Sequence, residues 1–313
     1  MINENKILTK IILGLGNTSF LDIKALAAIY AKSGVDMFDI TADEHALEAL
    51  FDGILSQNLN PNDFSICTSF SFSDDIHGSK AKIDDLKCTK CKKCKEICPY
   101  GAINENCEII YEKCIGCRKC SLCDAISYIK KVQNPVETLK SLQKFNINMV
   151  ELHVNGLTKN EILSEIKKIK EVFPKIKIGI CLTYQKYPIE EVKEIIEEAF
   201  ELVKPQELLF QADGKSMSGT TEDLYSAKSA VEFAKELNNI IKDKNIKIIL
   251  SGGCNSKTFE LVRQEKAKIS GIAYGSFARI LASPYVKNSE FWYNIDVINQ
   301  AIEKCSCLNV KHS

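Results

Sequence analysis

The sequence has no long apolar run, no excess charge of either sign and no apolar leader at its start. No stretch approaches the roughly 18 apolar residues that cross a bilayer, so we expect no membrane partner. Lysine plus arginine balances aspartate plus glutamate at 41 each, so the chain has no net positive charge that would attract nucleic acid. Residues 1–10 lack the continuous apolar stretch of a secretory signal. Together these absences predict a cytoplasmic protein.

Cysteine, in contrast, is concentrated in one block. Nine of the fourteen cysteines fall between Cys88 and Cys123. The first four form the run Cys88-x2-Cys91-x2-Cys94-x3-Cys98, followed by proline, which is the bacterial ferredoxin spacing for a [4Fe–4S] cluster. Three thiolates at this spacing can surround one face of a cube-shaped cluster. The fourth, before the proline, is placed to bind a companion cluster. The run predicts iron–sulfur redox chemistry.

A second run, Cys114-x2-Cys117-x2-Cys120-x2-Cys123, has a last gap one residue shorter than the pattern and no proline after it. With the usual crossing of ligands, cluster I takes Cys88, Cys91, Cys94 and Cys123, and cluster II takes Cys114, Cys117, Cys120 and Cys98. Cys107 is the alternative ligand should Cys123 not reach. A four-cysteine zinc site and a disulfide framework are the competing interpretations. The successive x2 gaps ending in Cys-Pro favour iron–sulfur over zinc, and the cytosolic composition disfavours disulfides.

Lysines crowd the first cysteine run, at positions 80, 82, 87, 90, 92, 93 and 95. They can offset the negative charge of thiolate-bound clusters. They can also form a docking face for an acidic electron-transfer partner.

Outside the cysteine block, short β-branched runs alternate with amphipathic helical stretches. Hydrophobic residues make up 45% of the chain and charged residues 26%, which is typical of a folded globular protein. The expected strands are Lys10–Leu15, Asp36–Ile40, Phe64–Phe70, Asn148–Val154, Lys175–Thr183, Glu207–Ala212, Lys247–Leu250 and Ile269–Tyr274. Eight strand–helix repeats predict an α/β fold, the (β/α)8 TIM-type barrel, with a doubly wound open sheet as the alternative.

This reading divides the chain into three parts. Residues 1–83 form the first part of the barrel with three strands, residues 84–131 a ferredoxin-like insert with two [4Fe–4S] clusters, and residues 132–313 the other five strands with a C-terminal helix and tail. The insert occupies a βα-loop, and such loops lie at the carboxyl end of a barrel, where active sites are built. We therefore expect the clusters over the barrel mouth, close enough to exchange electrons with a bound ligand. A ferredoxin module tethered there without a ligand is the simpler alternative.

Glycines follow the last two expected strands, in Ser251–Asn255 and Tyr274–Arg279. Loops at these places form the recurrent phosphate site of such barrels, so Gly252, Gly253, Gly275, Ser276 and Arg279 are the predicted binding residues for a phosphate-bearing ligand. The glycines could equally serve only to turn the chain. The lone Gly14-x-Gly16 is interpreted as a turn.

Polar residues at the expected strand ends are candidates for chemistry, foremost Asp213, Lys215, His153 and Asp39. Thr41, His77, Asn155 and Thr183 occupy similar places. The loop at 211–219 offers an acid, a lysine and two hydroxyls, with Ser218 expected to face the ligand, although a plain surface loop has a similar composition. His153 can point into the mouth or be a core histidine. Cys67, Cys181 and Cys254 are interpreted as small packed side chains, and Cys305 and Cys307 as free thiols.

Four segments together resemble one known family. In chain order these are residues 75–81, residues 212–219 with Asp-Gly-Lys-Ser-Met-Ser-Gly, residues 252–255, and residues 273–279 with Ala-Tyr-Gly-Ser-Phe-Ala-Arg. They are similar to the LdpA (light-dependent period) family. The resemblance implies a 4Fe–4S protein connected with redox input to the circadian clock of photosynthetic bacteria. The short gap before Cys123 and the many lysines depart from that family.

Two classes of function follow. The first is a redox sensor, in which the state of the clusters changes partner binding. The second is a reductase, in which the clusters feed electrons to a flavin or a small phosphorylated substrate in the barrel. The absorption spectrum and mass of the anaerobically purified protein would distinguish them.

Overall fold

Eight parallel strands close into a barrel in the computed structural model, which describes residues 7–14, 18–72, 79–98, 101–110, 113–114, 118–129, 133–214, 223–241 and 247–309. In barrel order the strands are β1 (Leu8–Gly14), β2 (Met37–Thr41), β3 (Ser65–Ser71), β6 (Met149–His153), β7 (Lys177–Thr183), β8 (Leu208–Asp213), β9 (Lys247–Ser251) and β10 (Gly271–Tyr274). Each overlaps one of the eight expected strands, and β10 pairs back with β1. The (β/α)8 prediction is confirmed, and the open sheet is excluded.

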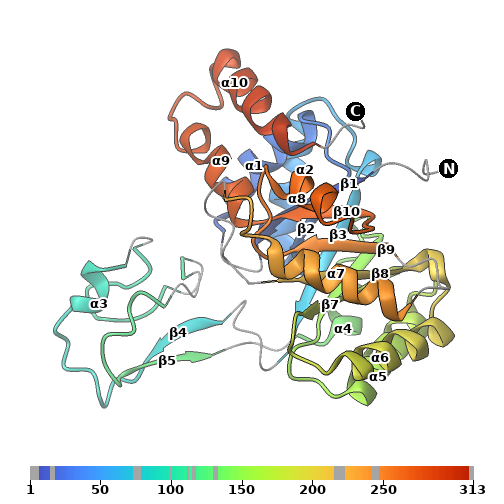
Figure 1. Cartoon of the computed structure of the whole chain (residues 1–313). Coiled ribbons are helices and arrows are strands. Elements are labelled where there is room, and N and C mark those ends of the chain that lie inside the picture. Colours follow the sequence, from blue (N-terminus) through green and yellow to red (C-terminus); the bar gives the residue numbers. More distant parts are fainter. Residues whose placement is uncertain are drawn as a thin grey trace.

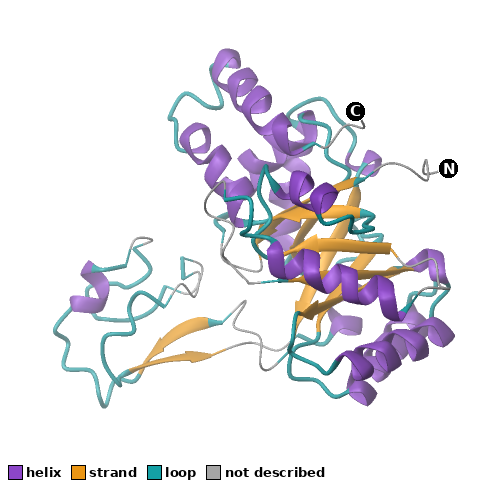
Figure 2. Ribbon diagram, in the orientation of Figure 1, coloured by secondary structure: helices purple, strands orange, loops and turns teal. Residues whose placement is uncertain are grey.

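Helices surround the barrel (Figures 1 and 2). They are α1 (Phe20–Lys32), α2 (Glu44–Leu55), α4 (Pro135–Ser141), α5 (Lys159–Val172), α6 (Ile189–Leu202), α7 (Lys228–Ile240), α8 (Thr258–Gln264) and α9 (Ser276–Val286), followed by α10 (Ile295–Cys305). Side-chain caps fix several helix starts, because Ser19, Asp43 and Thr158 each accept a hydrogen bond from a backbone amide of the first turn. None of the described helices is both long and apolar enough to cross a membrane.

The two faces of each strand have different neighbours. Outward residues such as Phe38, Ile40 and Phe210 pack against the helices in the main core. Inward residues at one level form a separate apolar cluster inside the barrel, made of Met37, Cys67, Met149, Leu209, Ile249 and Ala273. Because side chains alternate along a strand, the inward positions two residues further on lie nearer the carboxyl end. Most of those positions are polar, and they build the barrel mouth.

Between β3 and β6 the chain forms β4 (Lys80–Ile83), the short helix α3 (Lys93–Glu96) and β5 (Ile126–Ile129). β4 and β5 pair antiparallel with each other in a separate two-stranded sheet. This segment, which we call the insert, stands apart from the barrel (Figure 1). It leaves the barrel after Ser71, at the carboxyl end of β3. The expected domain boundaries and the placement of clusters over the mouth stay predictions, although β4 pairs within the insert and not with the barrel.

Candidate functional site

The insert is organised around a small cluster of alanine, isoleucine and cysteine side chains. Cys94 from the first run and Cys114 and Cys120 from the second are buried there together with Ala81 and Ile103. The β4–β5 ribbon closes one side, because Ala81 lies on β4. Both cysteine runs therefore belong to one folded unit.

Left-handed residues turn the chain between the thiols. Lys90, Lys92 and Arg118 have φ angles of 57°, 63° and 62°, a region that non-glycine residues seldom adopt. Each of them lies inside one of the x2 gaps. Such turns curl a short segment so that successive cysteines can face a common centre. Cys117 lies outside the described residues, as does the proline after Cys98.

Backbone amides point at several sulfurs. The amide of Ala81 lies 3.3 Å from the Cys114 Sγ, and that of Ala102 lies 3.4 Å from the Cys98 Sγ. The Lys93 amide donates to Cys91, which lowers the pKa of that thiol. N–H donors stabilise negative sulfur, so these residues fit the thiolate ligands of an iron–sulfur cluster. No two of the described cysteines are joined by a disulfide.

Cys107 and Cys123 differ in their surroundings. Cys107 is buried, with 1% of its surface exposed, and a φ of 58° turns the chain at this position. Burial raises the pKa of Cys94, and nearby Cys107 raises it further, so these two thiols are neighbours. Cys123 is exposed. Of the two candidate ligands, Cys107 is therefore the buried one.

The lysines of the insert are partly neutralised. Lys92 and Lys95 both pair with Glu105, at 3.0 and 2.5 Å, and Lys90 pairs with Asp85 at 2.8 Å. The positive charge beside the first run is therefore shared with acidic side chains of the insert itself. Its use as a docking face for an acidic partner stays a prediction.

A buried lysine occupies the centre of the barrel mouth. The Lys10 Nζ on β1 lies 2.8 Å from the Asp39 Oδ2 of β2 and 2.5 Å from the Glu151 Oε2 of β6. It also donates to the Gln211 Oε1 of β8 at 2.8 Å. Ser69 donates to the other oxygen of Asp39. All these side chains are buried, so the network has almost no contact with solvent.

Charge pairing controls protonation in this network. Burial alone would lower the pKa of Lys10, but the carboxylates of Asp39 and Glu151 raise it well above its ordinary value. The two carboxylates therefore favour the ammonium form of Lys10 over the neutral amine. Burial favours the neutral form of both acids, yet the pKa of Glu151 is lowered by Lys10 and His153, whereas that of Asp39 is raised.

Around Glu151 and the next level of the mouth lie further polar groups. The Glu151 Oε1 lies 3.2 Å from the His153 Nε2 and accepts a hydrogen bond from the Gln211 Nε2 at 2.7 Å. Further along the rim, the Asp213 carboxylate accepts hydrogen bonds from Ser251 at 2.9 Å and Thr183 at 3.3 Å. The predicted candidates Asp39, His153 and Asp213 thus lie at one end of the barrel.

Lys10, Glu151 and Gln211 were not among the predicted site residues. A signal was present, because each is a polar residue at an inward position of a mostly apolar strand. Without the register, however, the sequence does not show that these inward positions meet.

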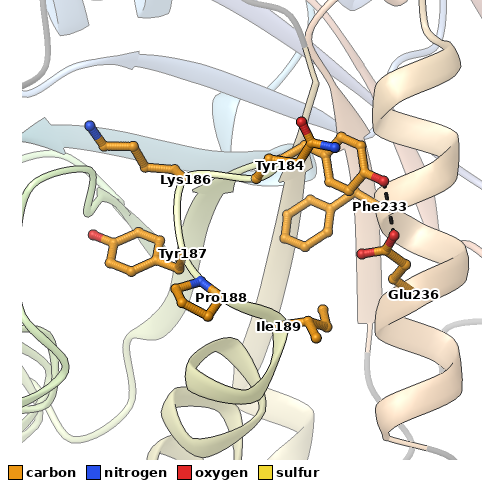
Figure 3. A pocket seen from close by; sticks show the side chains of 8 residues that line it. Tyr184, Lys186, Tyr187, Pro188, Ile189, Phe233 and Glu236 are labelled. Carbon is orange, nitrogen blue, oxygen red and sulfur yellow. Dashed lines mark hydrogen bonds between the residues drawn. The ribbon is translucent and has the colours of Figure 1, made fainter.

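A pocket of about 380 Å³ lies beside the loop after β7, at the first turn of α6 (Figure 3). The ring of Tyr184 packs against Phe233 of α7 with ring centres 5.4 Å apart, and its hydroxyl donates to Glu236 at 2.9 Å. Tyr187 anchors the loop by donating to the carbonyls of Val154 and Leu157. The Tyr184 amide donates a hydrogen bond to the Asp213 carbonyl, and this bond connects the pocket with the rim of the mouth.

With this geometry described, comparison with known proteins decides the family. The light dependent period A C-terminal domain matches residues 141–307, which is more than half of the chain. The chain belongs to the light dependent period A (LdpA) family. A 4Fe–4S binding domain matches residues 81–104, a range that contains the first cysteine run. This member of the LdpA family is therefore an iron–sulfur redox protein.

No curated protein matches this LdpA-family chain. Among solved structures, the YdjI aldolase from Escherichia coli K12 is 10% identical with a TM-score of 0.49, covering 96% of this chain and 88% of that one. KGPDC from Streptococcus mutans is 11% identical with a TM-score of 0.44, covering 96% and 98%. At such low identity the activities in these names say nothing about an LdpA-family protein.

The two predicted glycine loops of this LdpA-family barrel differ. Gly252 has a φ of +75°, and a Cβ there would lie 2.7 Å from both the Asp213 Oδ1 and the Gly214 amide nitrogen. Close packing therefore explains this glycine. At Gly275 a Cβ would meet nothing nearer than 3.8 Å, and one of its neighbours at that distance is the Arg279 Nη1. Arg279 also donates to the Ile12 carbonyl at 2.9 Å.

Several predicted residues cannot be placed. His77, Lys215 and Ser218 lie outside the described residues.

The other predicted loop residues are placed. The Gly253 carbonyl accepts a hydrogen bond from Ser226 at 2.6 Å. Ser276 begins α9 directly after Gly275. Phosphate binding by these loops stays a prediction.

Proposed function

We propose that this protein is a redox sensor that carries two [4Fe–4S] clusters in its insert and binds a phosphate-bearing ligand at the barrel mouth. The observation that carries the proposal is the burial of Cys94, Cys114 and Cys120 in one cluster, because it draws thiols of both runs into one small fold. Such clusters exchange single electrons. The insert joins the barrel at its carboxyl end, which supports communication between the clusters and the mouth.

The ligands of the two clusters follow the crossed pattern of ferredoxins. The first cluster takes Cys88, Cys91 and Cys94 with Cys123 or Cys107, and the second takes Cys114, Cys117, Cys120 and Cys98. The amides that face Cys98 and Cys114 support thiolates at these positions. The 4Fe–4S domain match covers only the first run, so the second cluster depends on the spacing and on the shared fold.

The ligand site is proposed at the start of α9. Gly275 leaves open space beside its backbone, the helix contributes the positive end of its dipole, and the Arg279 guanidinium lies next to both. A phosphate group suits this combination of amide donors and fixed charge. Gly252 and Gly253 follow the neighbouring strand β9 and are retained in the proposal, although close packing already explains the glycine at position 252.

A reductase is the second candidate. The buried network of Lys10, Asp39 and Glu151 favours it, because a binding module has no need for charged groups inside its barrel. In a reductase, the clusters would supply electrons to a flavin or another phosphate-bearing substrate at the barrel mouth. His153 and Asp213, which line the partly exposed rim, would hold or transfer protons.

Iron analysis tests the cluster count. The anaerobically purified protein should hold about eight irons with matching sulfide. Cys120→Ser should reduce this to about four irons, and so should Cys91→Ser. Cys307→Ser, which changes an exposed cysteine far from the insert in sequence, is the matched control and should leave iron unchanged. About four irons in the wild type, or more zinc than iron, would contradict two clusters.

A spectrum and a mass measurement separate the two candidates. The anaerobic protein is denatured, and the released small molecules are identified by absorption and mass spectrometry. A released flavin supports the reductase. A phosphate-bearing molecule without a flavin supports the sensor. Absence of any such molecule, together with no binding of added flavin mononucleotide or inorganic phosphate, would remove the ligand site from the proposal.

A further inference from the structure

Three different metal-binding groups meet inside the carboxyl end of the barrel. Glu151 and His153 lie on β6, and Cys181 lies on β7. One ligand atom from each lies within 4.8 Å of the other two. The sequence suggested only a packed cysteine at position 181, and its thiol is indeed buried, but it also hydrogen-bonds His153.

The strand register brings these groups together. Glu151 and His153 are two residues apart, so both side chains face the barrel interior. His153 pairs with Cys181 across the β6–β7 ladder, and Glu151 pairs with Gly179. A Cβ at Gly179 would lie 3.5 Å from the Glu151 side chain and 2.6 Å from the Met149 Cε. Glycine at this position therefore leaves room for the Met149 side chain, and a Cβ there would make only an ordinary van der Waals contact with Glu151.

Neighbouring groups hold the carboxylate in place. The Glu151 Oε2 is fixed by Lys10 at 2.5 Å, and the Oε1, which faces His153, accepts from the Gln211 Nε2 at 2.7 Å. The same Gln211 nitrogen lies 3.5 Å from the Cys181 Sγ. Hydrogen bonds of this kind orient the ligands of metal sites and are a regular part of them.

Charge and exposure also suit a cation. Two buried carboxylates, Asp39 and Glu151, share the single ammonium of Lys10. The Glu151 side chain is fully buried, whereas 13% of the His153 side chain is exposed, so the group opens to solvent on the histidine side. Three protein ligands with one open position are typical of catalytic zinc sites. Nitrogen and sulfur donors favour a transition metal over Mg²⁺ or Ca²⁺.

We propose that Glu151, His153 and Cys181 bind one divalent transition-metal ion of the Zn²⁺ class, separate from the cluster cysteines. The ion would take one carboxylate oxygen, one imidazole nitrogen and the thiolate sulfur, and would leave a position open toward the mouth. A polarised water or a ligand oxygen could occupy that position. This proposal does not depend on the number of clusters in the insert.

Zinc binding to the whole, cluster-loaded protein tests it. Wild type, Cys181→Ser, His153→Gln and the control Cys254→Ser are dialysed anaerobically against Zn²⁺ with a competing chelator, and zinc and iron are measured per chain. Cys254 is another buried cysteine, in the loop after β9, and lies outside the three-residue group. Wild type and the control should each bind one zinc more than the two variants. The loss in affinity should exceed the ~10–100-fold typical of removing an outer-shell partner, with iron unchanged.

A second readout keeps the test decisive if one variant folds poorly. Co²⁺ added to the wild type should give a thiolate-to-cobalt charge-transfer band in the difference spectrum, and this band should be absent from Cys181→Ser. Zn²⁺ should raise the unfolding temperature of the wild type and of Cys254→Ser but not that of His153→Gln. Equal zinc in all four proteins, or a Co²⁺ band that survives in Cys181→Ser, would overturn the proposal.

Discussion

At the scale of single residues, Lys10 is the side chain on which the barrel interior depends most. It is fully buried and lies within hydrogen-bond distance of Asp39, Glu151 and Gln211. A buried ion pair adds little over well-packed apolar groups, but removing one partner leaves an uncompensated charge. The role of Lys10 is therefore to compensate the negative charge of two buried carboxylates.

Replacing Lys10 by methionine should lower the free energy of unfolding by about 3–5 kcal/mol, because Asp39 and Glu151 lose their counter-charge. Urea unfolding of the cluster-loaded protein measures this. Lys24→Met is the matched control, because Lys24 pairs with Asp52 at the surface, at 3.3 Å, and should cost only about 0–1 kcal/mol. Equal effects of the two substitutions would show that the network is not charged as described.

The two unassigned cysteines of the insert give a second prediction at this scale. Cys107 is buried beside Cys94, whereas Cys123 is exposed and follows a shortened gap. We expect Cys107→Ser to lower the iron content from about eight to about four per chain and Cys123→Ser to leave it unchanged. Iron analysis and the reduced-state electron paramagnetic resonance spectrum of both variants decide this. Loss of a cluster in Cys123→Ser alone would restore the ordinary ferredoxin crossing.

At the scale of elements, the strands could be predicted but the barrel interior could not. Each strand is a short apolar run of the kind typical of parallel strands covered on both faces, so its existence is visible in the sequence. Lys10 and Glu151 lie 141 residues apart in the sequence, and only the closure of the sheet brings them together. The cysteine runs could be recognised in the sequence because the cysteines of each run lie close together along the chain. Arg279 and Gly275 were predicted as binding residues from their place after the last strand, and that role stays a prediction.

The start of α9 gives the prediction at this scale. Arg279→Ala should weaken the binding of flavin mononucleotide or inorganic phosphate by about 1.5–3 kcal/mol, because a charge-assisted hydrogen bond is lost. Isothermal titration of the anaerobic protein measures the affinity. Iron content should not change, since no predicted cluster ligand is altered.

Arg263→Ala is the matched control, because Arg263 is exposed on α8. Arg279 also donates to the Ile12 carbonyl of β1, so its removal can lower stability as well. A lower unfolding temperature with unchanged phosphate affinity would show that Arg279 only anchors β1. Arg279→Lys, which keeps the charge, should recover part of the affinity if the anion site is real.

At the scale of the whole molecule, the insert and the barrel differ in what holds them together. The barrel has a large core of its own, built from both faces of its strands and from the surrounding helices. The insert has a small cluster in which alanine and cysteine predominate over large apolar side chains. Units of this size rarely fold on apolar burial alone and commonly depend on bound metal.

Removing the iron–sulfur clusters should therefore unfold the insert and leave the barrel folded. After anaerobic treatment with ferricyanide and a chelator, the helical circular dichroism signal should remain, because the helices described in the insert amount to the short α3 alone. Trypsin should then cut at the insert lysines, such as Lys92 and Lys95, which are paired with Glu105 in the folded insert. Reassembly with iron and sulfide should restore protection from trypsin, which separates cluster loss from irreversible damage. Collapse of the helical signal together with the clusters would instead mean that the barrel depends on its insert for stability, and that the two parts act as one cooperative unit.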